Sequence, residues 1–245
     1  MFNDPAIHGT FGPMAAASAA DAFSTLAADR GGLARSSTAE RVADIMRERI
    51  TDGSLPPGSR LPEDAVGTAL GVSRNTLREA FRLLVHERLA VAEFNRGVFV
   101  RKLTRADVQD LYRVRRLVEC AAVRLAGEAS PAALGALRRT VADGEQAAAE
   151  GRWSEVGTAN MRFHQAIVAL AGSARLDEFM RQVAAELRLA FHVMDNPRAF
   201  HEPYLWRNRE LAAMIEDGDR TGAERLLEAY LGDAERQLLE SAPAT

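Results

Sequence analysis

The sequence has little cysteine, no long apolar run and no excess of basic charge. Cys120 is the only cysteine among 245 residues, so the chain cannot form an internal disulfide, as expected for a protein of the reducing cytoplasm. No apolar run approaches the roughly 20 residues that span a bilayer, and no basic segment followed by an apolar core begins the chain. We therefore expect neither a membrane span nor a secretory signal. A formal net charge of −3 argues against a chain that is strongly basic throughout, as many nucleic-acid binders are.

The charges are nevertheless unevenly distributed. Residues 37–102 carry 11 basic and 9 acidic residues, whereas residues 103–245 carry 18 and 22, and residues 1–36 carry 2 and 3. The small basic excess therefore falls in one segment. The length suits two domains, and 47% hydrophobic with 27% charged residues is ordinary for a globular protein.

Residues 1–36 are rich in Ala, Gly and Ser and are interrupted by Pro5, Pro13 and the pair Gly31-Gly32. This composition predicts a disordered or weakly ordered tail, with one candidate short helix near residues 15–28.

The segment from Leu61 to Ala90 predicts a helix-turn-helix. A short helix ends at the turn Gly71-Val72, and Ser73 is a suitable N-cap for a longer helix. The spacing of Leu77, Phe81 and Leu84 gives that helix one apolar face. Its other face carries polar residues near the N-terminus, namely Arg74, Asn75, Thr76 and Arg78. These side chains suit contacts with base edges in a DNA major groove, although an ordinary solvated helix face has a similar composition.

The flanking segments support the interpretation as a DNA-binding domain. Ser37 and Glu40 form a capping-box pattern, and an apolar stripe follows at Val42, Ile45, Met46 and Ile50. A rigid turn at Leu55-Pro-Pro-Gly58 precedes a short strand, Ser59-Arg60-Leu61.

After the helix-turn-helix, two short strands are predicted at Val91–Phe94 and Val98–Arg101, around Asn95-Arg96-Gly97. Gly97 can adopt the positive φ that a tight hairpin needs. Such a hairpin is a wing that places Arg96 near a DNA backbone or minor groove.

Residues 37–102 resemble the winged-helix domain of GntR-family bacterial transcription regulators. The resemblance is carried by Leu55-Pro-Pro-Gly-Ser-Arg-Leu61, Leu70-Gly-Val-Ser-Arg-Asn-Thr-Leu-Arg-Glu-Ala80 and Arg96-Gly-Val-Phe-Val100. It implies DNA contacts from the turn arginine, the start of the recognition helix and the wing glycine. In this chain these are Arg60, Ser73, Arg74, Asn75, Thr76, Arg78 and Gly97.

The rest of the chain predicts an all-helical second domain. We expect a linker at residues 103–107, a domain over residues 108–242, and helices near 104–127, 131–149, 153–171, 174–194, 199–217 and 220–240. Thr104 and Ser130 suit N-caps, and Pro131 suits a first helical position. Apolar stripes at Phe163, Ile167, Leu170 and at Phe179, Val183, Leu187 predict a shared core.

This second domain resembles the FCD ligand-sensing domain of the FadR subfamily, in its shorter, VanR-like version with six helices. The matching residues are Arg115-Arg-Leu-Val-Glu119, Phe163-His164 and Ala213-Met-Ile-Glu-Asp-Gly-Asp219. The expected fold is therefore mostly α: a winged helix-turn-helix followed by a six-helix bundle.

The resemblance also implies a site inside the bundle. Many FCD domains hold a divalent metal there with one Asp and three His residues. The corresponding positions here are Asn160, His164, Asn208 and Tyr230. Amide oxygens are weak ligands for transition metals and a phenol must first lose its proton, so we expect no metal and no other cofactor. His192 and His201 lie nearby in sequence and could in principle substitute as metal ligands. For both, we favour a polar helix face and a loop instead.

We expect the same residues to bind an organic effector. Asn160, His164, Asn208 and Tyr230 are predicted to converge in one cavity. Arg115 can hold a carboxylate through two hydrogen bonds, or can instead pair with Glu119 one turn further along its helix. Trp153, Phe191 and Trp206 are expected in the core or cavity wall, and Cys120 as buried filler.

These features predict a cytoplasmic, homodimeric transcription repressor, associated with the nucleoid when bound to DNA. It would bind a palindromic operator in double-stranded DNA under the control of a small-molecule effector, expected to be a carboxylate, without a membrane partner. One alternative is a metal-dependent enzyme or metal-sensing regulator that uses the bundle cavity, although no nucleophile–base pair is visible. Another is a helical protein-interaction module with a vestigial DNA-binding domain, which the intact Ser73–Arg78 segment disfavours.

Overall fold

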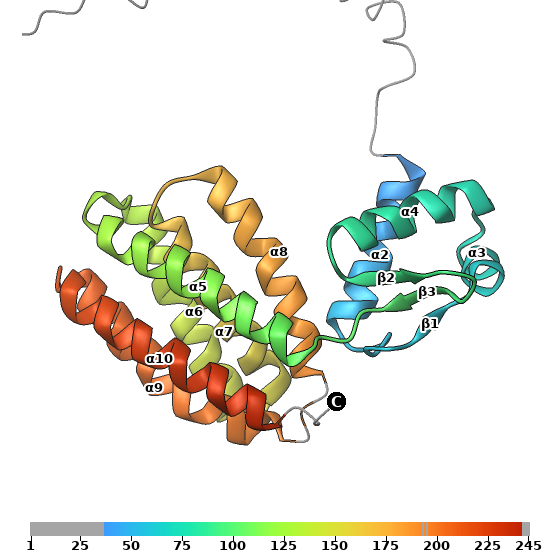
Figure 1. The fold of residues 1–245 in the computed structure, drawn as a ribbon. Helices are drawn as coiled ribbons and strands as arrows, with labels where there is room; N and C mark the ends of the chain where they lie inside the picture. The colour runs from blue at the N-terminus through green and yellow to red at the C-terminus, as the bar shows by residue number, and fades with distance from the viewer. Residues whose placement is uncertain (1–36, 193, 195, 242–245) are drawn as a thin grey trace, which may run out of the picture.

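The computed structural model describes residues 37–192, 194 and 196–241, which form a winged helix followed by a helical bundle (Figure 1). The predicted tail, residues 1–36, lies outside the described residues. The winged-helix elements are α2 (Thr38–Thr51), β1 (Arg60–Leu61), α3 (Glu63–Leu70), α4 (Arg74–His86), β2 (Ala90–Glu93) and β3 (Gly97–Val100). The bundle elements are α5 (Arg105–Leu125), the 3-10 turn η2 (Ala126–Glu128), α6 (Pro131–Ala149), α7 (Trp153–Ala169), α8 (Ala174–Phe191), α9 (Pro197–Glu216) and α10 (Arg220–Ser241). The mostly α fold class is confirmed.

Hydrogen-bonded caps set the start of several helices. The Ser37 hydroxyl accepts from the backbone N–H of Glu40, whose carboxylate accepts in return from the Ser37 N–H. Thr104 and Asp107 form the same reciprocal pair at α5, and Ser130 caps α6 ahead of Pro131. These side chains satisfy backbone donors that have no partner within the helix, so the predicted helix starts are confirmed.

A three-stranded antiparallel sheet completes the winged helix. Its strand order is β1-β3-β2, and Phe99 of β3 is paired with Arg60 on one side and Val91 on the other. The core beneath it is formed mainly by α2 and α4, with Val42, Met46, Leu77, Phe81 and Leu84 buried. Both wing strands begin one residue earlier than predicted.

Two residues of the predicted apolar stripes are exposed. Ile45 is 44% exposed and Phe179 is 40% exposed. Ala39 and Ala43 complete the buried face of α2, and Met180 takes the place expected for Phe179 on α8. The helices that pack against α2 and α8 decide which face of each is buried, and they leave Ile45 and Phe179 partly in solvent.

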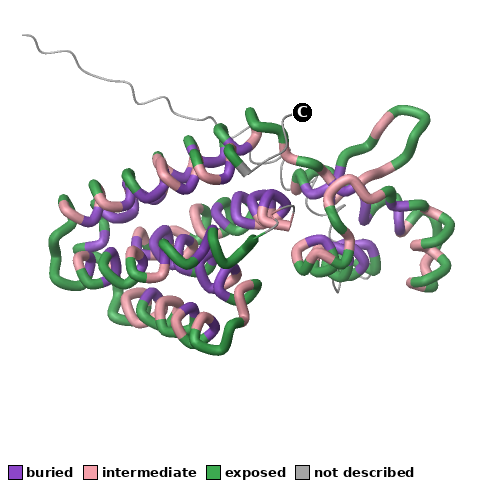
Figure 2. Tube along the Cα trace, turned by 90° about the horizontal axis from the view of Figure 1, so that it is seen from below, coloured by how far each residue is buried: buried purple, intermediate pink, exposed green. Residues whose placement is uncertain are grey.

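The bundle buries one continuous apolar core. Figure 2 shows buried positions concentrated on the inward faces of the helices, where Tyr112, Phe163, Ile167, Leu187 and Tyr230 are fully buried. Helix α5 packs against α10, and α6 against α7. Among the residues that the structure describes, no helix is both long and apolar enough to cross a bilayer.

The last turn of α8 contacts the DNA-binding domain (Figure 1). Nε of Arg188 and Nε2 of His192 lie 3.1 and 2.8 Å from the carbonyl oxygen of Thr51, at the end of α2. Leu189 is buried together with the core of the winged helix. His192, predicted in a loop or on a polar face, is thus a half-buried residue that joins the two domains, because the end of α8 packs on α2.

Candidate functional site

The start of α4 is a capped, exposed polar turn. Ser73 caps the helix by accepting from the backbone N–H of Thr76 at 3.2 Å, and the two hydroxyl groups lie 2.9 Å apart. Asn75 lies exposed between them in sequence. The opposite face of α4, with Leu77, is buried. The polar N-terminal turn of the helix therefore faces solvent, while its apolar face packs into the core of the domain.

Two acidic residues of α3 form ion pairs with the arginines of this turn. Nη2 of Arg74 lies 3.0 Å from Oδ1 of Asp64, and Nε of Arg78 lies 3.0 Å from both carboxylate oxygens of Glu63. The hydrogen bond to Glu63 raises the pKa of Arg78. Both pairs are exposed and so contribute little to stability. Asp64 and Glu63 were not among the predicted site residues, although both lie in the first turn of α3.

Contacts between side chains of the wing itself stabilise its turn. Asn95 and Gly97 have φ values of 58° and 103°, which confirms the positive φ predicted for Gly97. Arg96 pairs with Glu93 and lies over the ring of Phe99, 5.5 Å from its centroid. Phe94 at the tip is 91% exposed and was not among the predicted site residues.

Arg60 is brought next to the wing by the pairing of β1 with β3. Its Nε lies 3.7 Å from the position that a Cβ atom would occupy on Gly97. Two residues predicted to contact DNA, 37 positions apart in sequence, are therefore neighbours. The basic residues Arg60 and Arg96 both border this glycine turn.

Inside the bundle, one carboxylate connects two helices. Glu119 of α5 accepts from Nε of Arg115 at 2.8 Å through Oε1 and from Nδ1 of His164 at 2.7 Å through Oε2. All three side chains are buried. Burial lowers the pKa of His164. Although burial acts in the opposite sense, the charge of Arg115 and the bond from His164 lower the pKa of Glu119. The pairing of Arg115 with Glu119, one of two alternatives, is observed, and it makes Glu119 part of the site.

The other predicted cavity residues also converge. Nδ2 of Asn208 and the hydroxyl of Tyr230 each donate to Oδ1 of Asn160, both at 2.8 Å. The rings of His164 and Tyr230 meet edge to face with centroids 5.0 Å apart. Burial raises the pKa of Tyr230 well above its usual value, so its phenol remains a proton donor.

Three buried polar atoms in this cluster have no hydrogen-bond partner among the described residues: Nη2 of Arg115, Nε2 of His164 and Oδ1 of Asn208. The adjoining void, lined in part by Thr140, Gly144, Asn160 and Asn208, measures about 10 Å³. That is at the lower limit for one water molecule. A larger ligand would therefore require movement of the surrounding side chains.

The donor chemistry of this cluster does not fit a tightly bound transition metal. Oδ1 of Asn160 already accepts two hydrogen bonds, and the phenol of Tyr230 is protonated and directed at it. That leaves the imidazole Nε2 of His164 and one amide oxygen as available ligands, which is too few and too weak a set. Among the residues that the structure describes, no group of three or more His, Cys, Asp or Glu side chains is placed to hold a metal ion.

Two other residues differ from expectation. His201, predicted on a polar helix face or in a loop, is 3% exposed because α9 packs its ring between Phe191, Phe200 and Gly157. Its Nδ1 has no partner in the described part of the chain, and burial lowers its pKa to about 4. Trp206, expected in the core or cavity wall, is 55% exposed, where its ring contacts Arg207. Cys120 is buried, as predicted.

Family comparisons agree with the two halves of this structure. The profile of the bacterial regulatory proteins of the gntR family matches residues 38–100, and the FCD domain profile matches residues 110–233. The chain belongs to the GntR family and carries an FCD domain. It is therefore a transcription regulator and not an enzyme, so the enzyme alternative is rejected.

Individual relatives lead to the same family. A solved GntR transcriptional regulator from Rhodococcus sp. RHA1 is 44% identical, with a TM-score of 0.79 over 84% of this chain and 100% of that one. The HTH-type transcriptional regulator YdhC of Bacillus subtilis is 31% identical over 56% of this chain and 62% of its own length. The gluconate operon transcriptional repressor of Bacillus subtilis is 36% identical over a segment that covers 36% of this chain and 35% of its own length.

Proposed function

We propose that this GntR-family regulator acts in the bacterial cytoplasm as a homodimeric repressor that binds a palindromic operator. The observation that carries the proposal is the exposed polar turn at the start of α4, next to a wing with Arg60 and Arg96 at its glycine. In a dimer, each α4 would enter a major groove, and the two half-sites would lie about one helical turn of DNA apart. Repression is supported by the similarity to the gluconate operon repressor.

Within the proposed complex, the residues have different tasks. Arg74, Asn75 and Thr76 suit base edges, because an arginine can read guanine with two hydrogen bonds and an asparagine can read adenine. Arg60, Ser73, Arg78, Arg96 and Gly97 suit the phosphate backbone, which orients the domain without reading sequence. The acids Asp64 and Glu63 must release Arg74 and Arg78 when DNA binds.

The proposed effector is a small carboxylate that binds at the buried cluster in the bundle. Nη2 of Arg115, Nε2 of His164 and Oδ1 of Asn208 are buried and have no hydrogen-bond partner among the described residues, so each can bond to a ligand. Buried polar atoms without partners cost about 1–3 kcal/mol each, so a ligand that satisfies them gains affinity. Since Glu119 already neutralises Arg115, an added carboxylate would favour protonation of His164. We propose that no metal takes part.

Control of DNA binding would follow from a change in how the two winged helices are spaced. An effector shifts the equilibrium between dimer arrangements by its preference for one of them. The contacts of Arg188 and His192 with the end of α2 offer a route, because they join the bundle to the DNA-binding domain.

The direct test is fluorescence anisotropy with fragments from the region upstream of the protein's own gene, combined with sedimentation to determine the oligomeric state. A folded dimer that binds one fragment in a salt-dependent manner, and a scrambled fragment more weakly, would support the proposal. Equal binding to all fragments, or a monomer at working concentrations, would reject it.

A further inference from the structure

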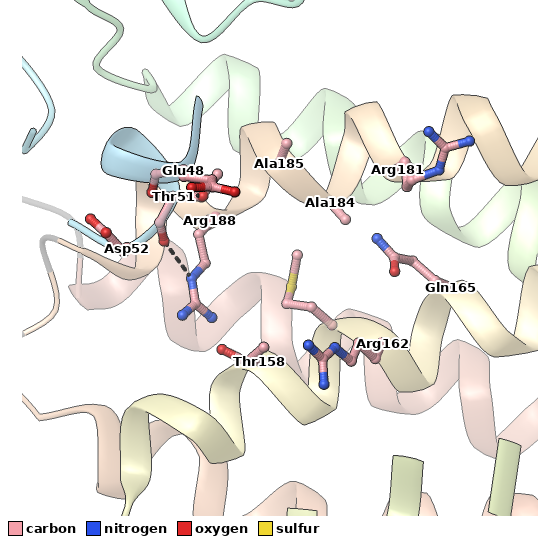
Figure 3. Close-up of a pocket in the computed structure, with 11 residues that line it drawn as sticks. Glu48, Thr51, Asp52, Thr158, Arg162, Gln165, Arg181, Ala184, Ala185 and Arg188 are labelled. Carbon is pink, nitrogen blue, oxygen red and sulfur yellow. Dashed lines mark hydrogen bonds between the residues drawn. The ribbon is translucent and has the colours of Figure 1, made fainter. Parts of the chain in front are cut away.

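A second cavity, lined by apolar as well as polar and charged residues, lies between the two domains on the outside of the bundle. It measures about 520 Å³ and is bordered by the end of α2 and by one face each of α7 and α8 (Figure 3). This volume lies within the usual range of small-molecule sites. We call this cavity the interdomain cleft.

The interdomain cleft is separate from the buried cluster in the bundle. On α7 it is lined by Thr158, Arg162 and Gln165, which lie three to four residues apart and therefore share one helical face. Asn160 and His164 lie on the opposite face of the same helix, since each residue turns the helix by about 100°. A ligand in the interdomain cleft would thus not occupy the effector position proposed above.

Arg188 places its guanidinium in the cleft. Its Nε donates to the backbone carbonyl oxygen of Thr51 at 3.1 Å, and it forms no ion pair with any carboxylate of the described residues. The side chain is half-buried, and burial alone lowers its pKa. A desolvated cation without a counter-ion is costly, and an anion in the cleft would offset that cost.

Arg162 supplies a second available cation on the facing helix. It is exposed and forms no ion pair within the described part of the chain. In the view of Figure 3 the Thr158 hydroxyl lies between the guanidinium groups of Arg162 and Arg188. That hydroxyl donates to Ser154, so its oxygen still has lone pairs to accept from a ligand, while the guanidinium groups can only donate.

The other charged residues of the cleft are mostly occupied. Arg181 pairs with Glu178, and Asp52 accepts from the backbone N–H of Ser54 at 2.8 Å and pairs with Arg49 at 3.3 Å. Glu48 lines the cleft without an ion pair among the described residues. Among the described residues that line the cleft, two cations and one carboxylate therefore form no ion pair.

We propose that the interdomain cleft binds a small organic dianion, with one anionic group on Arg188 and the other on Arg162. Guanidinium groups bind carboxylates and phosphates through paired, charge-assisted hydrogen bonds. Because Arg188 also holds the end of α2, the bound ligand would fix the DNA-binding domain against α8. That last consequence rests on the proposed function, whereas ligand binding does not.

The binding test is isothermal titration calorimetry of the full-length protein without DNA. The probes are succinate, malate, 2-oxoglutarate and glycerol 3-phosphate, each at up to about 10 mM, with succinamide and glycerol as neutral controls. We expect at least one dianion to bind and the neutral controls not to bind. If none of the four dianions binds, or if the neutral controls bind equally well, the proposal is wrong.

Variants then assign the site. Arg162→Gln is exposed and should fold normally, and we expect it to weaken binding about tenfold or more. Arg181→Gln is the matched control, because it makes the same change in net charge on the rim of the same cleft and should leave binding within about twofold. Glu48→Gln should tighten binding severalfold by removing the free carboxylate. Equal losses in Arg162→Gln and Arg181→Gln would overturn the assignment.

Arg188 needs a variant that separates folding from binding. Arg188→Gln removes both the charge and the contact with Thr51, so its melting temperature is compared with that of Arg188→Lys, which keeps the charge. We expect binding to be lost in Arg188→Gln and partly retained in Arg188→Lys. Unchanged binding in a folded Arg188→Gln protein would contradict the proposal. These outcomes require no DNA, so they remain distinct from a failure of operator binding.

Discussion

Nδ1 of His164 donates a hydrogen bond to Oε2 of Glu119 at 2.7 Å, between two helices and with both side chains buried. Since a carboxylate only accepts, Nδ1 carries the hydrogen, and in the neutral imidazole Nε2 is left as an acceptor. Glu119 also accepts a hydrogen bond from Nε of Arg115. One carboxylate therefore compensates a buried cation and fixes the tautomer of the histidine.

Replacing Glu119 by Gln should destabilise the bundle strongly. The substitution leaves the Arg115 cation buried without a counter-ion, and breaking a buried pair on one side costs about 3–5 kcal/mol. Urea unfolding followed by circular dichroism measures the loss. Asp110→Asn is the control, because it breaks the exposed pair with Arg113 on the same helix and should cost at most about 1 kcal/mol. Equal losses in the two variants would contradict this view of Glu119.

His201 should make the protein less stable in mild acid. Its pKa is about 4 in the folded protein, whereas its ordinary value, expected in the unfolded chain, is 6.5. Between these two pH values the unfolded chain takes up a proton that the folded chain does not. The associated stability is complete above pH 6.5 and is lost as the pH falls toward 4. A shift of this size corresponds to about 3 kcal/mol. Urea unfolding of His201→Phe across this range should show a flatter pH dependence than wild type; an identical slope would refute the prediction.

Removing the acid that holds Arg74 should strengthen DNA binding. Asp64→Asn frees the Arg74 guanidinium from an exposed ion pair, and such pairs are worth about 0.2–1 kcal/mol. We therefore expect about a two- to fivefold gain in affinity by anisotropy. Asp143→Asn makes the same change in net charge on α6 and should have no effect. A gain of the same size in both variants would show that only the overall charge matters.

The proposed absence of a metal can be tested by restoring the ligands. In a triple variant with Asn160→Asp, Asn208→His and Tyr230→His, the converging positions would supply a carboxylate and two imidazoles beside His164. We expect zinc to raise the melting temperature of this variant and not that of the wild type. Near-stoichiometric zinc, nickel or manganese in purified wild-type protein would contradict the proposal.

Local sequence signals predicted most of the fold. Helix α6 has the bounds predicted for it, Pro131–Ala149, because a cap, a proline and a terminal glycine mark both ends. The capping pairs of Ser37 and Thr104 lie within four residues and are visible in the sequence. The exposure of Ile45 was not predictable from spacing alone, because it depends on which face of α2 the neighbouring helices cover.

The sequence predicted which residues belong to the candidate sites but not which of their side chains contact one another. The family resemblance identified Asn160, His164, Asn208 and Tyr230, whereas the bond from His164 to Glu119 joins residues 45 positions apart. The acids of α3 that hold Arg74 and Arg78 were missed for the same reason. The interdomain cleft depends on the packing of α8 against α2, for which the sequence offers no local signal.

Arg74 in the first turn of α4 is expected to read base sequence. The most direct test compares Arg74→Ala with wild type by anisotropy, on the best-bound upstream fragment and on a scrambled fragment at the same salt concentration. We expect a loss of about 1–3 kcal/mol of binding free energy on the specific fragment, with little change on the scrambled one. An equal loss on both fragments would show that Arg74 contacts only phosphates, and no loss on either would contradict the account.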